Sequence, residues 1–218
     1  IAGRSEFASF PTPGGLLHTL AFSPDSQFLA VTTGGAGDQE HQGSTTVWNL
    51  DTKKKVLELE GAPCMLSQAA FSANGKTLSV VYGSLNLSTI QTWSFPSGKK
   101  LHQIPIANER LASLAFSPDS TLLFTGSLPG DLIRVWDVST GKEKRKLSSA
   151  MGVSPGVFRI AMSSQGVLAA AHLDGLITLW DASTIQPIGE LTGHNSYAVD
   201  LVFSPDGKRL LSCSEDLT

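Results

Sequence analysis

Short apolar segments alternate with turn-forming residues along the whole chain, and residues 111–147 show this arrangement most clearly. The apolar runs in this segment are residues 111–116, 122–125 and 132–138, and a charged stretch closes it at residues 142–147. The gaps contain Ser117-Pro118-Asp119-Ser120, Pro129-Gly130-Asp131 and Ser139-Thr140-Gly141. Each run has the length of a strand rather than a helix, and each gap carries turn-forming residues. The segment therefore predicts a small antiparallel sheet of four strands.

The same unit repeats along the chain, as four tryptophans at a nearly constant spacing show. Trp48, Trp93, Trp136 and Trp180 are 45, 43 and 44 residues apart. The turn after the first apolar run recurs five times, as Phe22-Ser23-Pro24-Asp25, Phe71-Ser72-Ala73-Asn74, Phe116-Ser117-Pro118-Asp119, Met162-Ser163-Ser164-Gln165 and Phe203-Ser204-Pro205-Asp206. A steady period of this length, with four short strands per unit, is typical of a repeat protein built from small sheets.

The period and the motifs resemble those of the WD40 family, whose repeats run ~40–45 residues and end in Trp-Asp. Trp136-Asp137 and Trp180-Asp181 match this ending, Trp48-Asn49 and Trp93-Ser94 are degenerate copies, and Gly193-His194 is the single Gly-His pair. The resemblance implies an all-β propeller of the WD40 type, with about five four-stranded antiparallel blades of which the first and last are incomplete. The repeats are expected at about residues 16–59, 60–104, 105–147, 148–191 and 192–218.

The strands expected at residues 132–138 and 176–180 are apolar on both faces. Side chains alternate along a strand, so Ile133 and Val135 point to one face while Trp136 points to the other. A sheet that is apolar on both faces has to be covered on both, as each blade of a propeller is by its neighbours.

The WD40 resemblance also implies a ring of seven or eight blades, and seven units of this size need roughly 300 residues. The chain has 218 residues, and its fifth unit lacks the tryptophan expected after Asp216. We therefore expect the chain to be part of a longer propeller with at least two further units. In isolation its end blades would expose apolar faces and strand edges, which predicts self-association.

Composition bears on the compartment and on the class of partner. The net charge is −3 with both signs interspersed, which argues against nucleic acid or an anionic membrane as a partner. The sequence contains no apolar run of the ~18 residues that a membrane span needs. Cys64 and Cys213 lie in or beside apolar stretches, which predicts two buried free thiols and a cytoplasmic protein. Lysines at residues 53–55 and 142–146 fall on expected outer strands, where they deter edge-to-edge pairing.

The WD40 resemblance further implies a structural hydrogen-bond network in each blade, formed by a His, a Ser or Thr, an Asp and the Trp indole. A buried indole N–H and a buried carboxylate both need partners, which is the physical reason for such a network. The residues that match it are Asp131 with Trp136, Asp174 with Trp180, and His194 with Asp216 and either Ser212 or Ser214. No blade holds the full set. The repeat positions of His194 and Asp216 favour a structural role over a catalytic pair.

No motif predicts a cofactor, a metal site or catalysis. His18, His102 and His172 lack metal-ligand spacing, and the glycines at residues 34–37 precede no helix that would bind phosphate. The acidic residues and histidine at 38–41 share a long polar loop, for which a solvated surface loop is favoured over a cation site.

The favoured function is a non-catalytic scaffold that binds other proteins or peptides. In WD40 domains the loops before the first strand and the second-turn loops share one face. That face is expected to carry residues 34–44 together with Glu109, Arg110, Pro129, Met151, Phe158, Arg159 and Tyr197. The alternative is a propeller enzyme or small-ligand binder with a site at the mouth of the central channel. That alternative would need a buried cluster of carboxylates or histidines at the channel.

Overall fold

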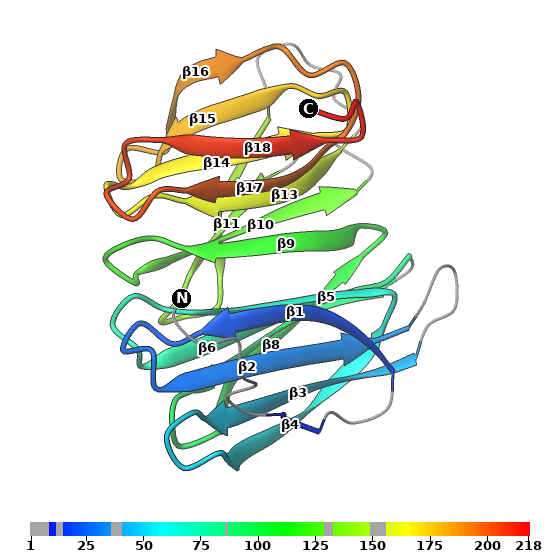
Figure 1. The fold of residues 1–218 in the computed structure, drawn as a ribbon, viewed down its shortest axis with the longest axis vertical. Coiled ribbons are helices and arrows are strands. Elements are labelled where there is room, and N and C mark those ends of the chain that lie inside the picture. The colour runs from blue at the N-terminus through cyan, green and yellow to red at the C-terminus, as the bar shows by residue number, and fades with distance from the viewer. Residues whose placement is uncertain (1–8, 12–14, 36–40, 86, 129–132, 149–155) are drawn as a thin grey trace, which may run out of the picture.

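The computed structural model describes residues 9–11, 15–35, 41–85, 87–128, 133–148 and 156–218, and its regular elements are all strands (Figure 1). Blade 1 contains β1 (Leu16–Phe22), β2 (Phe28–Gly34), β3 (His41–Asn49) and β4 (Lys54–Cys64), and blade 2 contains β5 (Leu66–Phe71), β6 (Thr77–Gly83), β7 (Leu87–Ser94) and β8 (Lys99–Ala107). Blade 3 contains β9 (Arg110–Phe116), β10 (Leu122–Leu128), β11 (Ile133–Asp137) and β12 (Glu143–Leu147). Blade 4 contains β13 (Val157–Met162), β14 (Val167–His172), β15 (Ile177–Asp181) and β16 (Gln186–Leu191), and blade 5 contains β17 (Ala198–Phe203) and β18 (Leu210–Ser214).

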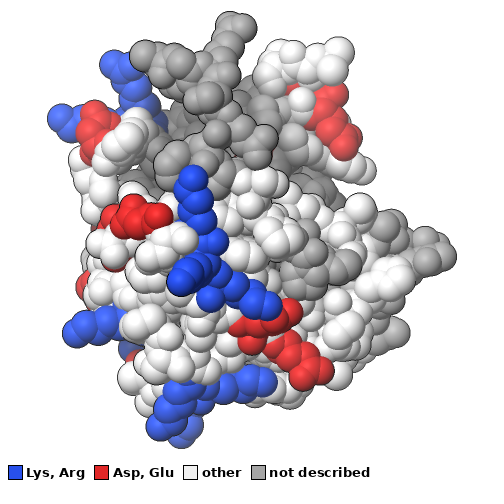
Figure 2. Space-filling view, turned by 60° about the horizontal axis from the view of Figure 1, so that its bottom comes forward, with Lys and Arg blue, Asp and Glu red and all other residues white. Residues whose placement is uncertain are grey.

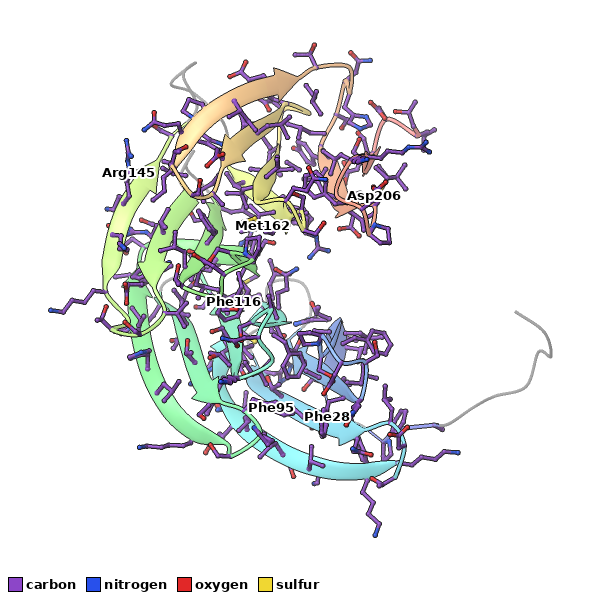
Figure 3. The ribbon with its side chains drawn as sticks, turned by 90° about the vertical axis from the view of Figure 1, so that its left-hand side faces the viewer. Phe28, Phe95, Phe116, Arg145, Met162 and Asp206 are labelled. Carbon is purple, nitrogen blue, oxygen red and sulfur yellow. The ribbon has the colours of Figure 1, made fainter. Side chains whose placement is uncertain are left out.

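Each of blades 1–4 is a four-stranded antiparallel sheet whose strands pair in chain order, and β17 pairs with β18 in blade 5. The first strands β1, β5, β9, β13 and β17 contact one another in succession and line the inside of an arc. The sheets stand side by side around this arc, which is open on one side (Figure 3). The all-β architecture of WD40-type blades is therefore confirmed. Strand β4 continues to Cys64 and β8 to Ala107, so the expected repeat limits at residues 59 and 104 fall inside strands.

The tryptophan of each of the first four blades lies at the same irregularity of the sheet. The register between the third and fourth strands shifts between Val47 and Trp48, Thr92 and Trp93, Val135 and Trp136, and Leu179 and Trp180. Such a bulge bends a strand and increases its twist. The bulge thus recurs once per blade in the four blades in which the structure shows a third and a fourth strand.

The hydrophobic core is divided among the gaps between neighbouring blades. The gap between blades 3 and 4 buries Phe124, Val135, Leu168, Ala170 and Trp180. Equivalent clusters fill the gaps between blades 1 and 2, blades 2 and 3, and blades 4 and 5. The blades therefore share their apolar faces, as the strand pattern at residues 132–138 predicts.

The two end blades keep large apolar side chains exposed. Leu20 and Phe22 of β1 are 54% and 63% exposed, whereas Leu114 and Phe116, which occupy the same positions in β9, are 3% and 6% exposed beneath blade 2. Leu211 of β18 is 69% exposed. Self-association of the isolated chain stays a prediction, and these are the surfaces on which it rests.

Polar bonds along the inner strands add a second connection between neighbouring blades. In each case a side chain near the start or middle of one inner strand bonds to the next inner strand. The bonds are Thr19 Oγ1–H to the Ser67 carbonyl (2.9 Å), Leu114 N–H to Gln68 Oε1 (2.6 Å), Ile160 N–H to Ser113 Oγ (3.0 Å) and the Arg159–Asp200 ion pair (2.9 Å). These bonds tie five consecutive blades together at the arc's inner surface.

The cysteine prediction is corrected in one respect. Cys64 is buried in the gap between blades 1 and 2, as expected, but Cys213 on β18 is exposed. The two residues do not form a disulfide with each other. The alternation of side chains along the two-stranded sheet of blade 5 turns Cys213 to solvent, and Leu211 is exposed on the same strand face.

Replacing Phe95 by alanine is expected to lower the free energy of unfolding by about 3 to 5 kcal/mol, because the change removes buried contacts and leaves a cavity. Phe95 is 8% exposed and packs edge-on against Phe28 and Phe71 at ring-centroid distances of 4.9 and 5.0 Å. Urea denaturation measures the effect. Phe22→Ala is the matched control, and its 63% exposed ring predicts a loss below about 1 kcal/mol. Equal losses for the two variants would contradict the packing described here.

Candidate protein-interaction surface

Because successive strands of a blade run in opposite directions, each blade presents two edges. We call one the turn edge; it consists of residues 23–27, 50–53, 72–76, 95–98, 117–121, 138–142, 163–166, 182–185 and 204–209. We call the opposite one the loop edge; its described residues are 35, 65, 84–85, 108–109, 148, 156, 173–176, 192–197 and 215–218. The residues predicted to bind a partner fall on or beside the loop edge.

Glu109 belongs to an ion-pair cluster around Arg134 of β11. The Arg134 guanidinium donates from Nε to Glu109 Oε2 at 2.9 Å, and its two terminal nitrogens bind Glu109 Oε1 and Glu143 Oε2. The side chains of Arg134, Glu109 and Glu143 are only 12%, 16% and 29% exposed. The hydrogen bonds that Arg134 donates to Glu109 are the main cause that raises the pKa of Arg134. Glu109 therefore anchors the loop that joins blades 2 and 3. Both of its carboxylate oxygens are bound by Arg134.

The other predicted interface residues differ in how free their side chains are. Arg110 starts β9 and is half-buried, and its Nε has no hydrogen-bond partner. Arg159 in β13 lies with its Nε 2.9 Å from Asp200 Oδ1, which makes an ion pair but not a hydrogen bond. Phe158 is half-buried at the start of β13, and Tyr197 is 46% exposed just before β17. The aromatic ring of Tyr197 is thus exposed to a partner, whereas the Nε atom of Arg110 is buried.

Several predicted residues lie outside the part of the chain that the structure describes. These are residues 36–40, Pro129 and Met151 of the predicted interface and Asp131 of the predicted hydrogen-bond network. Residues 41–44, which were expected in the same loop as 36–40, belong to strand β3 instead.

The indole N–H groups of the buried tryptophans in blades 3 and 4 each donate a hydrogen bond to a threonine hydroxyl. Trp136 Nε1–H donates to Thr125 Oγ1 at 3.0 Å, and Trp180 Nε1–H donates to Thr178 Oγ1 at 3.1 Å. His172, which is 1% exposed at the end of β14, lies with Nε2 2.9 Å from the same Thr178 hydroxyl. Blade 4 therefore holds a Trp–Thr–His chain of hydrogen bonds although it lacks a Gly-His pair.

Blade 5 brings His194, Ser212 and Asp216 together beside a cavity of about 210 Å³. His194 Nδ1 lies 3.2 Å from Asp216 Oδ2, and His194 Nε2 lies 2.8 Å from Ser212 Oγ. The Thr218 hydroxyl and the Asn195 N–H donate to the Asp216 carboxylate, and these bonds lower its pKa. Ser214, the alternative serine, donates to the Ser196 carbonyl instead.

An Asp–His–Ser chain is also the arrangement of a hydrolase triad. Blade 4 uses its own histidine–hydroxyl pair, His172 with Thr178, to support a buried indole. The same chemistry at the neighbouring blade supports the structural interpretation of His194 and Ser212.

Neither a metal site nor a membrane segment is found in the described part of the chain. Within those ranges no three His, Cys, Asp or Glu side chains gather closely enough to hold a metal ion. No described residue belongs to a helix that is long and apolar enough to cross a membrane.

Comparison with known proteins agrees with this geometry. The family model described as WD40, "WD domain, G-beta repeat", matches residues 98–137 and 185–218. The chain belongs to the WD40 repeat family. It is 27% identical to periodic tryptophan protein 2 of Arabidopsis thaliana over 92% of its own length, and 28% identical to bovine transducin beta-like protein 3 over 82% of its length. It covers 21% and 19% of those two proteins, so the chain spans about a fifth of their length. It is also 26% identical to target of rapamycin complex subunit wat1 of Schizosaccharomyces pombe, over 93% of this chain and 62% of that protein.

In blade 4 the residue two positions before the tryptophan accepts its indole N–H, and sequence analysis did not single out this position. This residue is Thr46, Gln91, Arg134 and Thr178 in blades 1 to 4. Thr178 accepts the indole N–H in blade 4, whereas Thr46 Oγ1, Gln91 Oε1 and the Trp48 indole nitrogen are buried without a hydrogen-bond partner. Side chains two positions apart lie on the same face of a strand, so alternation was the signal that pointed to these residues.

Arg134→Met is expected to lower the free energy of unfolding by about 2 to 3 kcal/mol, because it removes charge-assisted hydrogen bonds and leaves the Glu109 carboxylate unpaired. Urea denaturation at low ionic strength measures the loss. The matched control is Arg145→Met on the exposed strand β12, where a change within about 0.5 kcal/mol is expected. A loss that is the same for both arginines would show that the ion-pair cluster does not stabilise the protein.

Proposed function

We propose that the chain is a non-catalytic WD40 scaffold that binds other proteins through its loop edge. The observation that carries this proposal is the position of Arg110, Phe158 and Tyr197. The three residues lie at the starts of the inner strands of three consecutive blades, so they border one continuous rim. Tyrosine and arginine at such a rim are the residue types that most often dominate binding energy in protein interfaces. The relatives support a role in protein complexes in general, and one of them is by its name a complex subunit.

The stacked blades suit this role because they hold the rim rigidly. The inner-strand bonds and the Arg134 cluster join the rim residues to neighbouring blades. A preorganised surface loses little conformational entropy on binding, which favours affinity. Glu109 and Arg159 would then act mainly by positioning the rim rather than by contacting the partner.

We propose protein rather than nucleic acid or an anionic membrane as the partner. Basic and acidic side chains lie beside one another over the face shown in Figure 2, with uncharged surface between them. Lys55 pairs with Glu58, and Lys144 lies 3.8 Å from Asp137. Such interspersed charge generates no extended field of one sign. A cytoplasmic location is part of the same proposal, since the buried Cys64 and the exposed Cys213 suit a reducing compartment.

Tyr197→Ala and Arg110→Glu are each expected to weaken partner binding at least about tenfold, because both residues would lie in the contact. Affinity capture from lysate with quantitative mass spectrometry would identify partners, and titration with a purified partner would give the dissociation constants. Arg209→Glu, an exposed arginine on the turn edge, is the matched control and should bind like the unmodified protein. Melting temperatures of all variants should agree within about 2 °C. Unchanged binding by both loop-edge variants would refute the proposal.

A further inference from the structure

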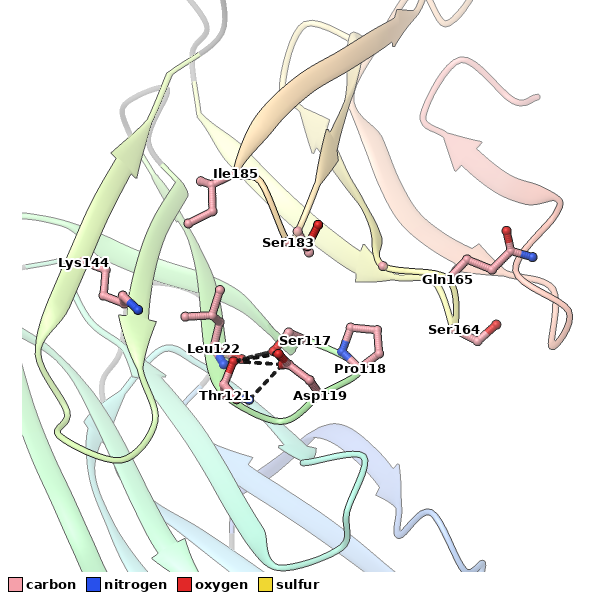
Figure 4. A pocket seen from close by; sticks show the side chains of 12 residues that line it. Ser117, Pro118, Asp119, Thr121, Leu122, Lys144, Ser164, Gln165, Ser183 and Ile185 are labelled. Atoms are coloured by element: carbon pink, nitrogen blue, oxygen red, sulfur yellow. Dashed lines mark hydrogen bonds between the residues drawn. The ribbon is translucent and has the colours of Figure 1, made fainter.

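The turn edge has an open cleft of about 440 Å³ between blades 3 and 4 (Figure 4). Pro118 in the first turn of blade 3 and Gln165 in the first turn of blade 4 lie on opposite walls, as the close view shows. Leu122, Ala182 and Ile185 contribute apolar surface, and these three residues belong to or pack against the hydrophobic cluster between the two blades. The cleft is large enough for a side chain of a partner molecule.

The cleft exists because one repeat position holds a small residue in blade 4. The residue two positions after each tryptophan donates its N–H to the turn after the first strand. In blades 2, 3 and 4 these bonds are Phe95 to Lys76 (2.8 Å), Val138 to Thr121 (3.0 Å) and Ala182 to Gly166 (2.9 Å). In blade 2 the Phe95 ring fills the gap to blade 1 by packing against Phe28 and Phe71 (Figure 3). Alanine at the same place in blade 4 leaves that space empty.

One residue at the cleft is unusual for its backbone conformation. Ile185 adopts φ 56°, in the left-handed region, where the corresponding residues of blades 1, 2 and 3 are Lys53, Gly98 and Gly141. A β-branched residue in this region is strained, and such strain is concentrated at functional sites. The strained residue contributes its partly buried apolar side chain to the lining of the cleft.

The walls of the cleft are not joined to each other. Asn74 N–H bonds Ser120 Oγ between the first turns of blades 2 and 3, and Gln165 Nε2 bonds the Asp206 carbonyl between those of blades 4 and 5. No hydrogen bond connects residues 117–121 with residues 163–166, all of which the structure describes. The turn of blade 4 is thus held toward blade 5, which keeps the gap to blade 3 open.

The charges at the cleft are those of Lys144 and Asp119. The Lys144 side chain is 51% exposed, and its ammonium nitrogen lies 3.8 Å from Asp137 Oδ2. The Asp119 carboxylate already accepts hydrogen bonds from the Ser117 hydroxyl and from the backbone and hydroxyl of Thr121. A loose, exposed ion pair contributes little to stability, so Lys144 is available to an external carboxylate.

We infer that this cleft binds an aromatic side chain presented by an extended segment of a partner protein, with an acidic residue of that segment beside Lys144. The occupant follows from the molecule itself, because the phenylalanine ring at position 95 fills the equivalent gap between blades 1 and 2. An aromatic ring of a partner, inserted between blades 3 and 4, would fill this cleft as Phe95 fills the gap between blades 1 and 2. This site lies on the turn edge and is independent of the loop-edge rim.

The test uses the peptide N-acetyl-Gly-Phe-Glu-Gly-amide, titrated into the isotopically labelled 218-residue protein and followed by NMR. Saturable shifts are expected at Leu122, Lys144 and Ala182. Peptides with alanine in place of phenylalanine, or lysine in place of glutamate, are expected to bind at least about tenfold more weakly. No saturable shift at the cleft, or equal affinity for the phenylalanine and alanine peptides, would overturn the inference.

Variants of the cleft separate this site from other binding. Ala182→Phe fills the gap from within and should abolish peptide binding, and Ala182→Val, which copies Val138 of blade 3, should weaken it even if the larger change disturbs folding.

Lys144→Glu should reverse the preference between the glutamate and lysine peptides. Lys142→Glu, two residues away on the chain and outside the cleft, is the control and should leave the preference unchanged. Tyr197→Ala should have no effect on the peptide, so the two proposed sites fail or succeed separately. A folded Ala182→Phe protein that binds the peptide normally would refute the cleft.

Discussion

The requirement that a sheet with two apolar faces be covered on both governs this structure. Each interior gap holds one hydrophobic cluster shared by two blades, so no interior blade has a core of its own. Where a neighbour is present, Leu114 and Phe116 are buried, and where none covers them the equivalent Leu20 and Phe22 are exposed. The stability of each blade therefore depends on the blade beside it, as in other repeat proteins.

The two proposed binding sites, one on each edge, differ in how the gaps between blades are closed. Inner-strand bonds such as Ser113 to Ile160 and the cluster around Arg134 hold the loop edge rigid, which suits a preformed binding surface. On the turn edge the closing residue changes from phenylalanine to valine to alanine across blades 2 to 4. One repeated framework thus gives a filled gap at Phe95 and an open cleft at Ala182, because side-chain volume differs and the first turn of blade 4 is bonded toward blade 5.

The sequence predicted what depends on local pattern. The recurring Ser-Pro-Asp turns and the alternation of apolar residues predicted the strands and their shared faces, because turn chemistry and alternation act within a few residues. The spacing of the tryptophans predicted the repeated four-stranded sheet. Contacts between distant segments were not predictable in this way. Glu109 was assigned to the interface, yet it binds Arg134 twenty-five residues later. His172 supports Trp180 through Thr178, and Cys213 is exposed, because strand pairing and sheet completeness decide these environments.

The central claim, that the blades stabilise one another through shared faces, is tested most directly by native-state hydrogen exchange of the 218-residue chain. The comparison is between the second strands of blades 1 to 3, each of which lies between two partners in a four-stranded sheet. Exchange in β6 and β10, which have a blade on both sides, should be at least about tenfold slower than in β2, which has a blade on one side. Equal protection of β2, β6 and β10 would contradict the account, because it would mean that each blade is stable without its neighbours.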